Sequence, residues 1–231
     1  MRNRPPERMS VSRNSAIAIL VIALPAAPVA RAQDSRLNTN AGAGFTAPLN
    51  PTAQFTGVSG HAVVGAGYNF TKHHSFVGQF MWSHLPSNRD ALRPIWLFTD
   101  DRNIRGSSEL FAVTGNYRFR LQGKTYGVYF IGGAGFYRRT MALSREVIEG
   151  RETGCTALWE WWGYPCESGV VSRDLTLLRK GFSSIGANGG IGFTIRINEE
   201  GYKFYIESRY HFAPTGGIST QIIPITFGFS W

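Results

Sequence analysis

The residues whose side chains are best suited to chemistry lie at alternate positions near the end of the chain. Glu207, Arg209 and His211 are two residues apart, so a strand would place them on one face. Polar side chains of this kind that point into a protein interior need partners, and a structural ion network supplies them. The predicted network consists of Arg118, Arg196, Glu207, Arg209 and His211, with no assigned catalytic role.

Nucleophilic catalysis is the alternative use of these residue types, and it requires a hydroxyl group within reach of its base. The sequence His211-Phe212-Ala213 has no serine two positions after the histidine. In Ser83-His84 the hydroxyl and the imidazole stand in the opposite order. We therefore expect no catalytic residue, and we interpret the protein as not an enzyme.

A second group of reactive and binding side chains lies between two cysteines. Cys155 and Cys166 suit one disulfide in an oxidising compartment, which would stabilise the loop by about 3 kcal/mol. The aromatic residues inside the loop suit a binding surface for a partner or a sugar, or a structural place at a membrane interface. These residues are Trp159, Trp161, Trp162 and Tyr164. The loop has too few Cys and His residues for a metal site, and we expect no metal or cofactor.

The amino end has the pattern of an export signal. A basic start precedes the apolar run 16–24, and Ala30 and Ala32 fit a small-x-small cleavage site. The run is too short to span a bilayer, which needs about 20 residues. We predict a cleaved signal peptide over 1–32 and one domain over 33–231. Its removal takes away five Arg and one Glu, so the formal net charge falls from +9 to +5.

The elements that position these residues are strands, because a period of two recurs eight times along the chain. Each stretch carries apolar residues on one face and small or polar residues on the other. The stretch 125–139 is the exception, since it is apolar on both faces and leaves its inward face open. The predicted strands are residues 37–46, 61–70, 75–84, 108–120, 125–139, 182–196, 202–212 and 223–231.

The connections between these strands alternate in length. Short turns follow the second, fourth and sixth strands, and long loops are expected over 47–60, 85–107 and 140–181. This alternation is typical of outer-membrane barrels, with short turns and both mature termini in the periplasm. An open sheet would leave unpaired edges in lipid. We therefore predict an all-β fold, an eight-stranded antiparallel up-and-down transmembrane β-barrel with a lumen filled by its own side chains.

The last strand carries the most specific pattern. Its alternate apolar residues are Ile223, Ile225, Phe227, Phe229 and Trp231. This strand resembles the carboxy-terminal strand of bacterial outer-membrane β-barrels, which the assembly machinery of that family reads as a sorting signal. Pro224 interrupts the strand, so we expect it near the outer rim, where pairing ends.

The architecture resembles the small eight-stranded barrels of the OmpA-like and OmpX-like kind, and the stretch 207–211 is similar to a segment common in these families. The resemblance implies an integral outer-membrane protein of a Gram-negative-type bacterium, with a structural or surface-interaction role through its extracellular loops. The partners implied are outer-membrane lipid, lipopolysaccharide and the assembly machinery, while the surface ligand is not specified. No outer loop is polybasic, so no nucleic-acid partner is expected.

Two other functions are compatible with a barrel of this size. The first is a lipid A-modifying enzyme, since some eight-stranded barrels deacylate lipid A with a His-x-Ser pair and a Glu. The second is a secreted, soluble lipocalin-like binder. The predicted outward face argues against the second, because its aromatic and aliphatic residues exceed the few hundred Å² of apolar patch that a soluble monomer tolerates.

Overall fold

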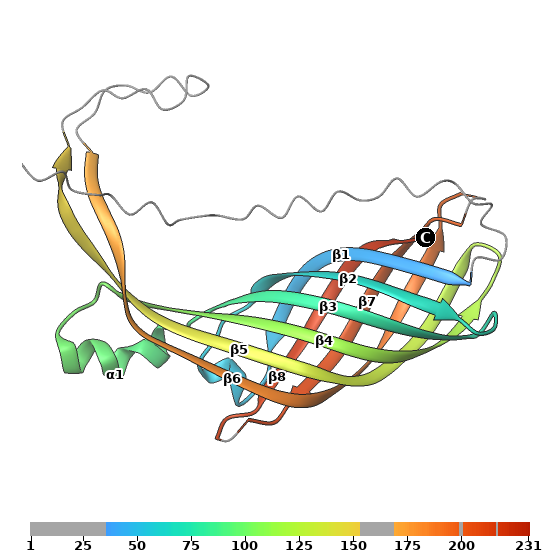
Figure 1. Ribbon diagram of the computed structural model, residues 1–231, viewed down its shortest axis with the longest axis horizontal. Helices are drawn as coiled ribbons and strands as arrows, with labels where there is room; N and C mark the ends of the chain where they lie inside the picture. The colour runs from blue at the N-terminus through green and yellow to red at the C-terminus, as the bar shows by residue number, and fades with distance from the viewer. Residues whose placement is uncertain (1–35, 153–168, 199–200, 216) are drawn as a thin grey trace, which may run out of the picture. The chain divides into compact units, whose positions relative to one another are not determined.

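The computed structural model describes residues 36–152, 169–198, 201–215 and 217–231, and the strands within them form one closed barrel (Figure 1). Each strand pairs antiparallel with the next, and the last pairs with the first. The eight strands are β1 (Leu37–Pro48), β2 (Ser59–Asn69), β3 (His74–Pro86), β4 (Ile104–Gln122), β5 (Tyr126–Glu152), β6 (Gly169–Arg196), β7 (Lys203–Ala213) and β8 (Thr220–Ser230). The predicted eight-stranded up-and-down barrel is confirmed.

The period of two sorts side chains between the lumen and the outer surface. On β3, Val77 and Met81 are buried inside, whereas Phe76, Phe80 and Trp82 are exposed outside. The same sorting runs through the other strands, so the outer wall is apolar and aromatic. A wall of this kind is stable in contact with lipid.

Strand β5 is apolar on both faces in sequence, and the structure resolves which face points inward. Tyr129, Ile131 and Tyr137 are buried in the lumen, and Phe130 and Phe136 are exposed. The large inward rings need small residues on the neighbouring strand. A Cβ atom placed on Gly192 of β6 would lie 2.1 Å from the Tyr129 ring, so glycine makes the space that this tyrosine fills.

The two ends of the barrel differ. Short turns join β2 to β3, β4 to β5 and β6 to β7, and we call this the short-turn end. At the opposite, long-loop end, the short 3-10 helix η1 (Thr52–Gln54) ties two connections together. The Thr52 hydroxyl donates to the Ser219 carbonyl at 3.0 Å and accepts from the Gln221 amide at 2.8 Å.

The predicted long connection 85–107 contains a helix, α1 (Arg89–Thr99). Asn88 caps it by accepting a hydrogen bond from the Asp90 amide, and Asp100 ends it in the left-handed conformation. The Trp96 indole donates to the Ile104 carbonyl at 2.9 Å and fixes the helix against the start of β4. No helix among the described residues is long and apolar enough to cross a membrane.

The prediction of a loop over 140–181 is wrong, because β5 and β6 continue through most of it. The β4–β5 ladder ends at Arg145 and the β6–β7 ladder at Ala187, yet β5 and β6 stay paired to Glu152 and Gly169. Beyond Arg145 they continue as a two-stranded extension of the barrel (Figure 1). We call residues 140–152 and 169–181 the ribbon.

Pro224 lies within β8 and not at its outer end. It faces Thr46 of β1, and the β1–β8 ladder continues past it to Pro48 and Ile222. The ladder to β7 is interrupted here, between the Ser208–Ile225 and His211–Ile222 pairs. The missing N–H of proline therefore coincides with a break in the middle of a seam, and the expected place at the rim is wrong.

Candidate functional site

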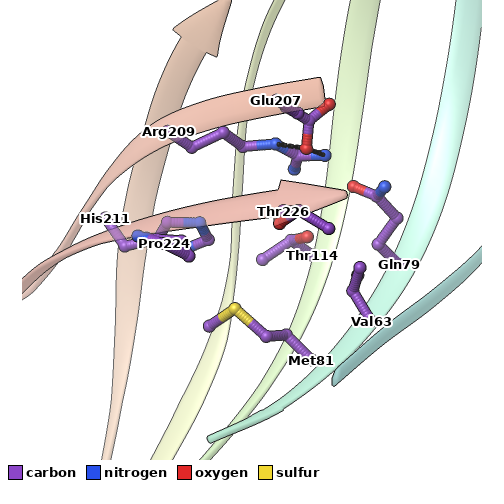
Figure 2. A pocket seen from close by; sticks show the side chains of 9 residues that line it. All are labelled: Val63, Gln79, Met81, Thr114, Glu207, Arg209, His211, Pro224 and Thr226. Atoms are coloured by element: carbon purple, nitrogen blue, oxygen red, sulfur yellow. Dashed lines mark hydrogen bonds and ion pairs between the residues drawn. The ribbon is translucent and has the colours of Figure 1, made fainter. Parts of the chain in front are cut away.

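Glu207 is the centre of the buried polar network in the lumen (Figure 2). Its Oε1 accepts a hydrogen bond from Arg209 Nε at 2.6 Å, and Arg209 Nη2 lies 2.5 Å from the same oxygen. Its Oε2 accepts a hydrogen bond from the Tyr129 hydroxyl at 2.6 Å. The carboxylate is therefore satisfied on both oxygens, as a buried charge requires.

The network extends from this pair to other inward residues. The Arg118 guanidinium lies over the Tyr129 ring, 4.7 Å from its centroid. His211 Nδ1 lies 2.9 Å from the Tyr137 hydroxyl. Four of the five predicted network residues are thus buried in the lumen: Arg118, Glu207, Arg209 and His211. Arg196, the fifth, is exposed at the short-turn end.

Sequence reasoning missed the tyrosines and one histidine of this network. Tyr129 and Tyr137 lie on β5, where both faces are apolar and the inward face could not be chosen. His61 lies on β2 and is buried in the lumen. Its ring nitrogens lie 2.9 Å from Thr226 Oγ1 and 3.1 Å from Thr46 Oγ1.

The lumen leaves little room around these groups. A cavity of about 10 Å³ lies beside Glu207, Arg209 and His211, which is about the space of one water molecule. Figure 2 shows the side chains that surround it, including Gln79 and Met81. In the described part of the chain, no three His, Cys, Asp or Glu side chains are grouped so that they could hold a metal ion. The packing leaves no space here for a substrate.

The second candidate site is the ribbon at the long-loop end. Its β6 strand is exposed from Arg173 to Gly181, with apolar side chains at Leu175, Leu177 and Leu178. The β6 strand has an extra residue here, because the register shifts between the Leu143 and Ser144 pairs of β5.

Two ion pairs tie the base of the ribbon to the start of β4 and to the connection before it. Arg105 Nη2 lies 2.8 Å from Glu146 Oε2, and Arg145 Nε lies 2.7 Å from Asp101 Oδ2. Both pairs are partly exposed, so they orient the ribbon more than they stabilise the barrel.

The predicted sorting strand has the expected geometry. Its apolar residues lie on the outward face of β8, where Phe227 and Phe229 are exposed, and Trp231 directly after β8 is exposed as well. Trp231 exchanges two backbone hydrogen bonds with Thr39 of β1, at 2.8 and 3.0 Å, and so completes the closing seam. The sorting role itself stays a prediction.

Several predicted sites lie outside the described residues. They are the cleavage-site residues Ala30 and Ala32, the cysteines Cys155 and Cys166, and the aromatic residues Trp159, Trp161, Trp162 and Tyr164. The disulfide, the aromatic binding surface and the signal peptide therefore stay predictions.

Comparison with solved structures found other small outer-membrane proteins. Ail, the attachment invasion locus protein of Yersinia pestis, is 12% identical with a TM-score of 0.45, over 84% of this chain and 97% of Ail. Neisserial surface protein A is 9% identical with a TM-score of 0.49, over 85% and 96%. The N-terminal β-barrel domain of OprF from Pseudomonas aeruginosa is 9% identical with a TM-score of 0.39, over 85% and 98%.

A search among curated proteins found no match. The sequence profile of the outer membrane protein β-barrel domain, in contrast, matches residues 16–230. This match spans most of the chain and agrees with the closed barrel and its apolar outer wall. The chain belongs to the outer membrane protein β-barrel domain family, whose place is the bacterial outer membrane.

Proposed function

We propose that this barrel acts at the cell surface without catalysis, through the ribbon and α1 at its long-loop end. In outer-membrane barrels the long loops face outward and the short turns face the periplasm, which places the ribbon outside the cell. The ligand is a partner or a sugar of the extracellular environment.

The observation that carries this proposal is the length and exposure of the ribbon. Spanning the membrane requires strands of about 10 residues, and β5 and β6 are 27 and 28 residues long. The extra length exposes Leu175, Leu177 and Leu178 on β6. On the long-loop side, Leu97 and Phe98 of α1 are also exposed. Apolar groups exposed together mark interaction surfaces.

The lumen supports a role that is neither transport nor catalysis. Side chains fill it around Glu207, so a large open pore has no path there. His61, which lies within hydrogen-bond distance of two threonine hydroxyls, is buried in the lumen, where an acyl chain in the membrane has no access. The runner-up function, a lipid A-modifying enzyme, requires a base and a hydroxyl that lipid can reach.

The experiment that tests the proposal removes the ribbon and keeps the barrel. Ala142 and Arg179 are register partners, so an Asn-Gly turn placed between them closes a short hairpin. The wild-type and trimmed proteins, each in nanodiscs, are tested on arrays of glycans and extracellular-matrix proteins. We expect the wild type to bind at least one arrayed ligand and the trimmed protein to lose that binding. Equal binding by both proteins would contradict the proposal.

A second experiment tests the enzyme alternative. Lipid A is analysed by mass spectrometry from cells with and without the gene. We expect identical spectra, since no catalysis is proposed. A lost acyl chain or another mass change that depends on the gene would show an enzyme.

We also propose that the assembly machinery recognises the outward residues of β8. Trp231, which directly follows β8, and Trp82 of β3 are outward tryptophans of nearly equal exposure, 40% and 39%. We expect Trp231→Ser to reduce the amount of heat-modifiable barrel in the outer membrane several-fold more than Trp82→Ser does. Equal losses would mean that β8 carries no special signal.

A further inference from the structure

The short-turn mouth of the lumen gathers positive side chains from three strands. They are Arg118 and Arg120 of β4, Arg196 of β6 and Lys203 of β7, which we call the cationic vestibule. Arg196 is exposed, Arg120 and Lys203 are half-buried, and Arg118 is only 6% exposed. The exposure of these side chains therefore falls from the mouth towards the interior of the lumen.

These charges converge although their strands are not all neighbours. Arg196 and Lys203 face each other as register partners. The Lys203 ammonium donates to Gln122 Oε1 at 3.4 Å, so it reaches from β7 to β4 across the mouth. Arg120, Arg196 and Arg118 are all close enough to repel this ammonium.

The described residues provide little negative charge to offset this repulsion. Glu207 is the one buried carboxylate among the described residues, and Arg209 and Tyr129 already occupy both of its oxygens. Arg120 donates one hydrogen bond to Asn69 Oδ1, which is a neutral acceptor. The vestibule is thus a group of like charges that are partly shielded from water.

Two buried donors in the vestibule also lack acceptors. The Nε atoms of Arg118 and Arg120 are buried and have no hydrogen-bond partner among the described residues. A buried guanidinium N–H without an acceptor is costly, and more so when neighbouring charges have the same sign. An anion bound in the vestibule would remove both costs at once.

We propose that the cationic vestibule binds a phosphate-type oxyanion. Arginine presents a planar fork of donors that matches phosphate oxygens, and lysine adds a point charge. The partly buried position strengthens each attraction relative to bulk water. In the orientation proposed above, the mouth opens to the periplasm, where the oxyanion is either free or part of an anionic phospholipid headgroup.

The first arm of the test uses free phosphate. The full mature chain, folded in dodecyl maltoside and chloride buffer, is titrated with inorganic phosphate, and binding is measured by calorimetry and by ³¹P NMR line width. We expect saturable binding that Arg120→Gln and Lys203→Gln each weaken about tenfold, the loss of one charge-assisted hydrogen bond. Lys124→Gln removes the same charge from an exposed turn at the same end, so it should leave the affinity unchanged. Heat-modifiable migration confirms that each variant is folded.

The second arm uses lipid. The barrel is placed in phosphatidylcholine nanodiscs with and without phosphatidylglycerol, and the retained lipid is counted by native mass spectrometry. Phosphatidylglycerol retention that falls in Arg120→Gln and Lys203→Gln identifies the headgroup as a source, and phosphate binding in the first arm identifies the free ion. Binding of neither probe overturns the proposal, as does an equal loss in Lys124→Gln.

Discussion

Strands β5 and β6 form part of the barrel wall and the whole of the ribbon, but different contacts hold them in the two regions. From Tyr126 to Arg139, β5 has one buried face and one exposed face, and it pairs with β4 on one side and β6 on the other. In the ribbon, β6 has exposed residues on both faces and a partner on one side. The same chain therefore changes from a wall held by its surroundings to a hairpin held largely by itself.

This difference shows where the stability of the molecule lies. A hairpin of two strands is marginally stable in water by itself, whereas a closed barrel leaves no edge unpaired. Changes inside the barrel should therefore unfold the protein, and similar changes in the ribbon should leave it folded. The ribbon is free to vary for binding because the barrel does not depend on it.

The largest difference is expected from two glycine substitutions. A Cβ atom on Gly133 would lie 2.0 Å from the Gly115 carbonyl, whereas one on Gly181 would meet nothing closer than 4.0 Å. We expect Gly133→Val to cost more than about 3 kcal/mol, because backbone has to move, and to abolish the heat-modifiable band. Gly181→Val should migrate like the wild type. Equal folding of both variants would contradict the comparison.

The second test compares a buried ion pair with an exposed one. Glu207→Gln leaves Arg209 buried without its partner, which costs about 3–5 kcal/mol. Glu146→Gln removes the partner of Arg105, whose side chain is 70% exposed, and should cost less than about 1 kcal/mol. Urea unfolding of both proteins in the same micelles measures the difference. Similar shifts of the unfolding midpoint would show that the lumen network is not important for stability.

The smallest effect on the barrel should follow from cutting the ribbon. Trypsin can cleave after Arg179 and Lys180, which are exposed, but not after the buried Arg118. We expect limited digestion to cut the ribbon, so that a heated gel shows fragments and an unheated gel shows an intact, fast-migrating barrel. Loss of the folded band after cleavage would show that the ribbon is part of the stable unit.

The strands of the barrel could be predicted because each has one face towards lipid and one towards the lumen. Outward apolar residues therefore alternate with small or polar inward residues in the sequence. The ribbon could not, because a strand exposed on both faces has no such pattern, and residues 140–152 therefore resemble a loop. The same reasoning explains which lumen residues could be predicted. Charged inward residues such as Glu207 and Arg209 stand out in sequence, whereas Tyr129 does not, because β5 is apolar on both faces.

Four charged residues that lie buried in the lumen could be named from the sequence, but their contacts could not. Alternation shows that Glu207 and Arg209 share a face, yet it cannot show that Tyr129 supplies the second hydrogen bond across the lumen. Contacts between side chains of different strands depend on the strand register and on the diameter of the barrel. Alternation puts Arg120 and Lys203 in the lumen, whereas their position at the same mouth depends on the register of their strands.

The most direct test of the account is the side of the membrane on which the ribbon lies. In a background with Cys155→Ser and Cys166→Ser, single cysteines are introduced by Thr176→Cys in the ribbon and Lys124→Cys in a short turn, where both native residues are exposed. Intact cells are then treated with a membrane-impermeant maleimide. The account predicts that Thr176→Cys is labelled on intact cells and Lys124→Cys only after lysis. The reverse pattern would contradict it.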